Sequence, residues 1–367
     1  MTLRERFVSA LAFERLDRAV HTEWGFWDDT LSRWRTEGLP DDVVDPSFSY
    51  VTAGHDVFQH FGIAKFGYIL PGQYYRPPFP YELVDEDDHY RVERTENGVL
   101  QRVNKMNPTI PEFIDYPVKN RRDYEAIRDR LAPDAAGRYP DDWTELVEIA
   151  RTQDHTPMCT HMDGFFASPR EMMGLTGFLT TLYDDPGLIR EMVNDRAEFY
   201  IAVYERALRE MQPDFAFVWE DMCFKNGPLL SPAMFREFLL PAYRKLISFL
   251  RDMGVVHVVV DSDGDVLELI PLWIEAGVTA LLPFEVRAGM DVVEIGELFP
   301  DLVILGGIDK HRIAEGRASI DDELDRVLPA MLARGGYLAG LDHWVPPQIS
   351  CDDFRYYVER LQSYRAP

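Results

Sequence analysis

The chain has 367 residues, of which 63 are acidic and 38 are basic, so its formal net charge is −25. This excess of acid argues against binding to nucleic acids or anionic membranes, because both need a concentrated basic face. Hydrophobic residues make up 46% and charged residues 28%, which is typical of a globular protein. Three scattered cysteines, and the lack of an apolar run of about 20 residues, predict a cytoplasmic protein.

The first part of the chain gives weaker structural signals than the rest. Residues 1–13 have the pattern of an amphipathic helix, and residues 20–23 predict a first strand. Glu96-Asn97-Gly98 predicts a turn between two further strands. These strands belong to a β excursion before residue 110, which the sequence predicts at residues 81–84, 90–94 and 100–103.

From about residue 156 onward, short apolar runs alternate with longer amphipathic stretches, which is typical of parallel strands joined by helices. Because each run is apolar throughout, we expect both of its faces to be buried. The runs lie at residues 157–160, 215–219, 255–260, 280–283, 302–305 and 337–341. With residues 20–23 they predict a single α/β domain over residues 1–367, a TIM-type (β/α)8 barrel with an N-terminal helical segment. A doubly wound open sheet is the alternative, although its glycine-rich phosphate turn is missing from the sequence.

Several helix starts can be predicted from local motifs. Ser231-Pro232 and Asp185-Pro186 each combine a capping side chain with a proline in the first turn. Ser350 and Asp353 form the pattern of a capping box at the start of the last helix. Pro241 falls inside a predicted helix and should kink it.

Ionisable residues follow nearly every predicted strand of the barrel. Reactive groups in such barrels lie at the carboxyl ends of the strands, so we expect these side chains to share one rim. Each of them could instead be a helix cap or part of a loop ion pair. They are His161 and Asp163, Glu220 and Asp221, Asp261 and Asp263, Glu285 and Arg287, Asp309, and Asp342 and His343.

The densest group of acids is Asp261-Ser262-Asp263-Gly264-Asp265. Carboxylates at i and i+2 on a strand end point to the same side, so Asp261 and Asp263 could hold one cation together. With His343 as a nitrogen ligand, such a site would suit Mg, Mn, Fe or Zn. The alternative is a turn whose acids cap the following helix.

His343 is the first candidate for a catalytic residue, because imidazole titrates near neutral pH and can act as an acid, a base or a ligand. The adjacent Asp342 could orient its ring and raise its basicity. Glu220 and Asp221 offer a carboxylate pair, but neighbours on a strand face opposite ways, so we expect one of them in the site.

An aromatic cluster follows the predicted first strand. Trp24 and Trp27 come directly after Glu23, and together they could line the mouth of the barrel for a planar or methylated substrate. Core packing or an oligomer interface would explain the same residues equally well.

Motifs along most of the chain resemble those of the uroporphyrinogen decarboxylase superfamily, which includes zinc-dependent methyltransferases that handle methylcobamide and coenzyme M. They include Pro169-Arg170-Glu171-Met172-Met173-Gly174, Asn226-Gly227-Pro228-Leu229-Leu230-Ser231-Pro232, Asp261-Ser262-Asp263-Gly264 and Gly306-Gly307-Ile308-Asp309. The resemblance implies a TIM-type barrel with its cleft at the carboxyl ends of the strands, and a homodimer, since the family often dimerises.

The chain departs from both branches of the superfamily. Where the decarboxylases carry an arginine-rich run that holds the porphyrinogen carboxylates, this sequence reads Thr22-Glu23-Trp24-Gly25-Phe26-Trp27. His343 matches the histidine of the decarboxylases. The His-x-Cys-Gly motif and the distal cysteine of the methyltransferases correspond here to Asp261-Ser262-Asp263-Gly264 and His343, so any bound metal would have oxygen and nitrogen ligands.

We therefore expect a methyltransferase-like enzyme that acts on a small organic substrate, for example an aromatic methylated one. The resemblance implies a divalent metal, zinc or a harder ion, and a corrinoid carried by a partner protein. The alternatives are a carboxy-lyase, in which His343 or Asp221 protonates the carbon that loses carbon dioxide, and a non-catalytic binding barrel. The residues expected to bind substrate are Glu23, Trp24, Trp27, His161, Lys225 and Arg287.

Overall fold

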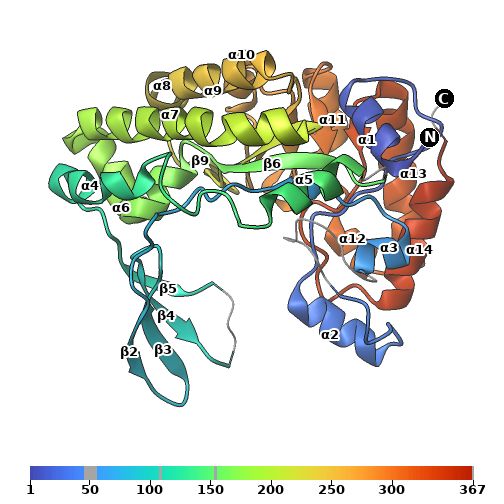
Figure 1. Cartoon of the computed structure of the whole chain (residues 1–367). Coiled ribbons are helices and arrows are strands. Elements are labelled where there is room, and N and C mark those ends of the chain that lie inside the picture. Colours follow the sequence, from blue (N-terminus) through green and yellow to red (C-terminus); the bar gives the residue numbers. More distant parts are fainter. Residues whose placement is uncertain (45–55, 107–109, 153–154, 366–367) are drawn as a thin grey trace.

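A computed structural model describes residues 1–44, 56–106, 110–152 and 155–365 (Figure 1). Its centre is a parallel seven-stranded sheet in the order β1-β6-β7-β10-β11-β12-β13, which curls in the manner of a half-barrel. The strands are Gly67–Ile69 (β1), Met158–Asp163 (β6), Phe215–Trp219 (β7), Val258–Asp261 (β10), Ala280–Leu282 (β11), Val303–Leu305 (β12) and Tyr337–Leu338 (β13).

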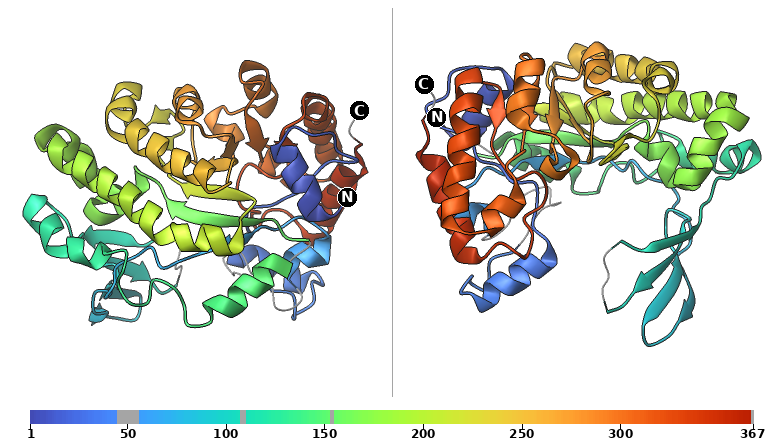
Figure 2. Two further views of the ribbon diagram at one scale, coloured as in Figure 1. Left: turned by 45° about the horizontal axis from the view of Figure 1, so that its top comes forward. Right: turned by 180° about the vertical axis from the view of Figure 1, so that it is seen from behind.

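Helices cover the convex face of this sheet and lie roughly along its strands (Figure 2). The longer helices of the described residues are Leu3–Leu11 (α1), Asp28–Thr36 (α2), Trp143–Thr152 (α5), Ala167–Asp184 (α6), Pro186–Met211 (α7), Leu240–Asp252 (α9), Arg317–Arg334 (α13) and Cys351–Ser363 (α14). Of these, α1 packs against the inner side of the sheet, where Phe7 stacks on Phe215. The shorter ones are Val57–Phe61 (α3), Arg121–Ile127 (α4), Pro232–Met234 (α8), Ile270–Ala276 (α10), Val292–Leu298 (α11) and Lys310–Ala314 (α12). None of the helices in the described part of the chain is long and apolar enough to span a bilayer.

The strands are buried on both faces, as their uniformly apolar sequences predict. In β7, Phe215 and Phe217 face the inside of the curled sheet, where they pack with residues of other strands. Ala216 and Val218 face the helices and belong to the larger core outside the sheet. The prediction of an α/β fold with a parallel sheet is therefore confirmed.

The predicted first strand, residues 20–23, is reduced to two isolated bridges. His21 pairs with Ala339 next to β13, and Thr22 pairs with Ala64 ahead of β1, both in the parallel sense. Close approach at this seam requires glycine at position 340, because a Cβ there would lie 2.1 Å from the carbonyl oxygen of Thr22.

The β excursion is an antiparallel four-stranded sheet that projects away from the main body as an arm (Figure 1). Its strands are Glu82–Glu86 (β2), Tyr90–Arg94 (β3), Leu100–Asn104 (β4) and Glu112–Asp115 (β5). The predicted turn at residues 96–98 is present, with Gly98 at a φ of +81°. Strand β5 was not predicted, because its four residues are mostly exposed and do not alternate between polar and apolar.

The predicted helix starts are all observed. The side chains of Asp185, Ser231 and Ser350 each accept a hydrogen bond from the backbone N–H three residues on. Pro241 lies in the first turn of α9, and the five residues before that helix, Phe235–Leu239, form a π-helical turn instead of a kinked α-helix. Since proline has no N–H to donate, the wider turn accommodates the missing hydrogen bond.

Candidate active site

Three carboxylates meet where β7 and β10 end. Asp261 is the last residue of β10, Asp263 lies in the loop after it, and Asp221 follows β7 with a φ of +48°. One oxygen from each lies within 4.8 Å of the others. Gly264 lets this loop approach the segment after β7 closely, because a Cβ there would lie 2.7 Å from the carbonyl oxygen of Phe224. Asp261 and Asp263 thus converge as predicted, and Asp221 joins them.

Burial and the charges within this acidic cluster, Asp221, Asp261 and Asp263, raise the pKa of Asp221 and of Asp261. Burial and the neighbouring charge of Asp263 raise the pKa of Asp221 to about 6. Burial, followed by the charges of Asp221 and Asp263, raises the pKa of Asp261 well above its usual range. Closely spaced acids that titrate near neutral pH are a feature of sites that transfer protons or bind cations.

His343 lies at the edge of the acidic cluster. Its Nε2 atom lies 3.4 Å from Oδ2 of Asp263, and its Nδ1 accepts a hydrogen bond of 2.7 Å from the backbone N–H of Trp344. The bond to Nδ1 selects the Nε2–H tautomer of the neutral ring. Burial lowers the pKa of His343, but the hydrogen bond and charge of Asp263 outweigh burial, so that the pKa is raised above 6.5.

The expectation that Asp342 orients the ring of His343 is wrong. The carboxylate of Asp342 is fully buried and accepts hydrogen bonds from the backbone N–H groups of Val286 and Lys310. It also forms an ion pair of 3.2 Å with the Lys310 ammonium group. The side chains of Asp342 and His343 point in different directions. The acidic partner of His343 is instead Asp263, which follows another strand.

Glu220 lies outside the acidic cluster, so the structure brings only one residue of the Glu220–Asp221 pair into the site, as expected. The Glu220 side chain is fully buried and accepts hydrogen bonds of 2.9 Å from the backbone N–H groups of Phe165, Phe166 and Ala167 at the start of α6. The Tyr243 hydroxyl donates a further hydrogen bond. Glu220 thus holds the helix in place, and we do not propose it as a catalytic residue.

A pocket of about 330 Å³ opens beside the acidic cluster and is lined by Asp221, Asp263, Glu285, Arg170 and Lys225 among others. Arg170, which the sequence did not single out as a site residue, donates a 2.7 Å hydrogen bond to the carbonyl oxygen of Asp221 and lies 4.9 Å from the ring of Trp219. Glu285 accepts a hydrogen bond of 3.0 Å from the Gly264 N–H. Lys225, which the sequence suggested as a substrate contact, is exposed and lines the pocket.

The predicted aromatic mouth lies against His343. The Trp27 ring stacks on the imidazole with a centroid distance of 6.0 Å and an angle of 5°, and Trp24 lies at 6.4 Å. The backbone ties the two segments together, because the N–H of Val345 donates a 2.9 Å hydrogen bond to the carbonyl oxygen of Gly25. The wall beside the imidazole is thus built from both ends of the chain.

The other predicted substrate contacts lie elsewhere. Glu23 is buried and accepts a hydrogen bond of 3.1 Å from the Leu341 N–H and one of 3.2 Å from the Tyr357 hydroxyl. The ring of His161 stacks on Phe217 at 5.3 Å inside the sheet. Arg287 is exposed and is not one of the residues that line the pocket.

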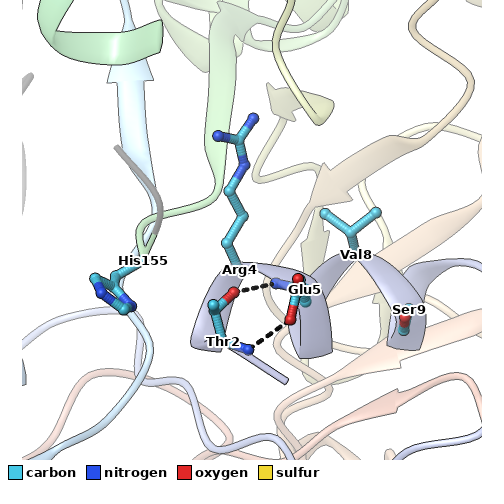
Figure 3. Close-up of a pocket in the computed structure, with 6 residues that line it drawn as sticks. All are labelled: Thr2, Arg4, Glu5, Val8, Ser9 and His155. Atoms are coloured by element: carbon cyan, nitrogen blue, oxygen red, sulfur yellow. Dashed lines mark hydrogen bonds between the residues drawn. The ribbon is translucent and has the colours of Figure 1, made fainter. Parts of the chain in front are cut away.

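Other pockets lie apart from the acidic cluster. One, of about 610 Å³, is formed by α1 and His155, next to the amino-terminal end of β6 (Figure 3). It lies at the opposite end of the strands from the carboxylates, and Thr2 and Glu5 in its wall cap the helix through reciprocal hydrogen bonds. Another, of about 250 Å³, includes Asp163 and Arg196, whose side chains form a buried ion pair of 3.7 Å. We therefore centre the candidate site on the acidic cluster and His343.

Comparison with known families identifies the chain. Residues 101–364 match the family model described as Uroporphyrinogen decarboxylase (URO-D). This region spans β4 to α14 and contains the acidic cluster and His343. The chain belongs to the URO-D family. The superfamily resemblance seen in the sequence is thereby confirmed.

Individual relatives of this URO-D family member are distant. It is 26% identical over 145 residues to the uroporphyrinogen decarboxylase of Trichlorobacter lovleyi and 29% identical over 136 residues to that of Geobacter metallireducens. Each match spans 38% of the relative's length and 36% of this chain. In structure it is similar to a methyltransferase from Methanosarcina mazei, with a TM-score of 0.62, 15% identity, and coverage of 99% of this chain and 98% of the other. That similarity supports the fold.

The ligands of a thiolate zinc site are missing from the acidic cluster. The resemblance seen in the sequence matches the zinc motif of the methyltransferase branch to Asp261, Asp263 and His343, whose side chains are two carboxylates and an imidazole. Cys223 lines the adjacent pocket but is not part of the group of converging ligand atoms. Zinc held by thiolates depends on soft sulfur donors, so this arrangement does not fit it.

Proposed function

We propose that this URO-D family protein is a methyltransferase-like enzyme that acts on a small organic substrate at the carboxyl ends of the strands. The observation that carries the proposal is the position of His343, which lies between the Asp263 carboxylate and the Trp27 ring beside an acid-rich pocket. A titratable group next to an aromatic surface and a cavity is a common arrangement for catalysis on an organic molecule.

The charges of the pocket favour a neutral or cationic substrate. Asp221, Asp263 and Glu285 line it, while Arg170 and Lys225 are its basic residues. Asp261 adds a further acid behind them. A polycarboxylate such as a porphyrinogen would meet like charge here, which is costly where solvent is excluded. The Trp24 and Trp27 rings suit a planar aromatic substrate.

In the proposed reaction, the bond between the methyl carbon and its heteroatom breaks, and both electrons stay on the heteroatom. His343, protonated with the help of Asp263, donates a proton to that leaving atom. The methyl group passes to a nucleophile. A corrinoid carried by a partner protein would supply such a nucleophile, and we propose that partner together with the reaction.

Methyl transfer to free cob(I)alamin tests the proposal. Purified protein is incubated with a panel of methoxylated and N-methylated aromatic compounds, and methylcobalamin is followed by absorbance. We expect turnover with at least one compound and a loss of at least about 100-fold in His343→Asn, since general acid catalysis contributes that much or more. His311→Asn, which alters an exposed histidine on α12, is the matched control. Equal rates in both variants would refute the role of His343.

Decarboxylation is the second candidate, because the family model is that of uroporphyrinogen decarboxylase and two cations, Arg170 and Lys225, line the pocket. In that reaction His343 or Asp221 would protonate the carbon from which carbon dioxide leaves. Incubation with uroporphyrinogen and mass analysis of the products decides between the two. Stepwise loss of carboxyl groups would replace methyl transfer by decarboxylation. If both assays fail and a ligand binds away from His343, the protein is a binding barrel.

We further infer that the chain forms one domain in which residues 20–23 serve as the eighth strand of a closed barrel. The bridges of His21 to Ala339 and of Thr22 to Ala64 support this closure.

We also propose that the protein forms a homodimer. Sedimentation equilibrium of the purified chain tests this proposal, and a monomeric mass at all concentrations would exclude the dimer.

A further inference from the structure

The acidic cluster lacks the basic partners that acids in such a position normally have. Among the described residues, no lysine or arginine nitrogen lies within 4.0 Å of a carboxylate oxygen of Asp221, Asp261 or Asp263, while ion pairs of that length occur in many other parts of the chain. Arg170 reaches the backbone oxygen of Asp221 instead of its side chain. Among the described residues, the three carboxylates thus make one ionic contact within 4.0 Å, between Asp263 and His343.

Asp261 gives a second indication. Its side chain has no exposed surface, and within the described part of the chain neither of its carboxylate oxygens has a hydrogen-bond partner. Its position is fixed by β10, which pairs with β7 on one side and β11 on the other. Burying a carboxylate without hydrogen-bond partners is unfavourable, more so than burying an uncharged polar group. A fixed, buried carboxylate that points at two further acids therefore indicates a ligand.

We propose that Asp221, Asp261 and Asp263 bind one hard divalent cation of the Mg²⁺ or Mn²⁺ type. Their converging oxygen atoms, within 4.8 Å of one another, provide three ligands of the kind that such ions prefer. Because Asp221 and Asp263 also line the pocket, the remaining coordination positions face it, where water or a substrate oxygen can bind. The inference goes beyond the proposed function and does not depend on it.

The ligand set differs from the one that the sequence suggested. Asp221 takes the third place, and His343 lies outside the group, where it forms an ion pair with Asp263. A site made of carboxylates favours Mg²⁺ and Mn²⁺, whereas imidazole and thiolate ligands favour zinc. A cation at this position leaves the imidazole free for proton transfer at the edge of the pocket.

Binding of Mn²⁺ to the purified full chain, followed by the loss of the EPR signal of free Mn²⁺, tests the proposal without any assay of activity. We expect one ion per chain, displaced by Mg²⁺, and an affinity at least about tenfold weaker in Asp261→Asn and in Asp221→Asn. Asp265→Asn is the matched control, since this acid belongs to the same loop but not to the cluster, and it should bind within about twofold of the wild type. Two independent variants keep the test valid if one fails to fold.

Three results would overturn the proposal. The first is no Mn²⁺ binding at about 1 mM, the weak end of the affinities known for such sites; a shared proton would then hold the acids together. The second is stoichiometric zinc that Mn²⁺ cannot replace. The third is an affinity in His343→Asn that falls as far as in Asp261→Asn, because the imidazole would then be a ligand. A chain that binds Mn²⁺ but transfers no methyl group would refute the proposed function and leave this site intact.

Discussion

His343 and Asp263 come from loops that are 80 positions apart in the sequence, yet their side chains form an ionic contact of 3.4 Å. The residue type alone made His343 a candidate, because imidazole titrates near neutral pH. Its partner could not be read from the sequence: the neighbouring Asp342 is fully occupied by Lys310 and two backbone N–H groups. Sequence adjacency is a poor guide at a strand end, where the direction of each side chain depends on the turn that follows.

His161 is expected to make the stability of the protein depend on pH. Burial lowers its pKa from 6.5 to about 4. The unfolded chain therefore binds a proton at a higher pH than the folded one, and stability falls as the pH decreases from about 6.5 to about 4, by up to about 3 kcal/mol. In His161→Phe, which keeps an aromatic ring against Phe217, this contribution should disappear.

Urea unfolding at pH 7.5 and at pH 4.5 measures the effect. The wild type should lose more unfolding free energy between the two pH values than His161→Phe does, and the difference between the two losses is the contribution of His161. Equal losses in the two proteins would show that His161 titrates normally in the folded state, which would fit an open, substrate-facing ring better than a buried one.

At the scale of elements, local motifs predicted well and tertiary contacts predicted poorly. Strand β7 and the starts of α7, α8 and α14 were found from the sequence because they depend on neighbouring residues, such as the capping side chains of Asp185, Ser231 and Ser350. The first turn of α6 is different. It is fixed by Glu220, which lies more than 50 positions later in the chain, so no local motif marks it.

Replacing Glu220 by Gln should destabilise the protein by about 3 kcal/mol, because three backbone N–H groups and the Tyr243 hydroxyl would lose a buried charged acceptor. Urea unfolding provides the measurement. Asp221→Asn is the control one position away; it relieves repulsion within the acidic cluster and should leave stability unchanged or raise it. A stable Glu220→Gln protein without activity would instead assign Glu220 to catalysis.

On the scale of the whole molecule, the central parallel sheet and the arm differ in how much of their own surface is buried. Strands β6, β7 and β10 are covered on both sides, whereas β2 is exposed along its whole length and β5 along most of it. The sequence predicted both units, but it did not predict that the arm would project from the body with so little covering it (Figure 2).

Hydrogen exchange should reveal this difference. We expect amide protons of β2 to β5 to exchange much faster than those of β6, β7 and β10, because a sheet with exposed faces opens at little cost in free energy. Mass spectrometry of peptides after exchange measures the rates. Equal protection of the arm and the strands of the central sheet would mean that a second copy of the chain covers the arm, as in the proposed homodimer.

The wall of the site joins the beginning and the end of the chain, through Val345 with Gly25 and through Trp27 with His343. During synthesis the ribosome completes the acidic cluster some 80 residues before His343 is made. A nascent chain that has reached Asp263 therefore contains all three acids of the cluster but does not yet contain the imidazole of His343. The assembled site forms only after the last strand has been translated and has returned to the N-terminal segment, so a chain that terminates between β12 and His343 holds the acids and lacks the imidazole.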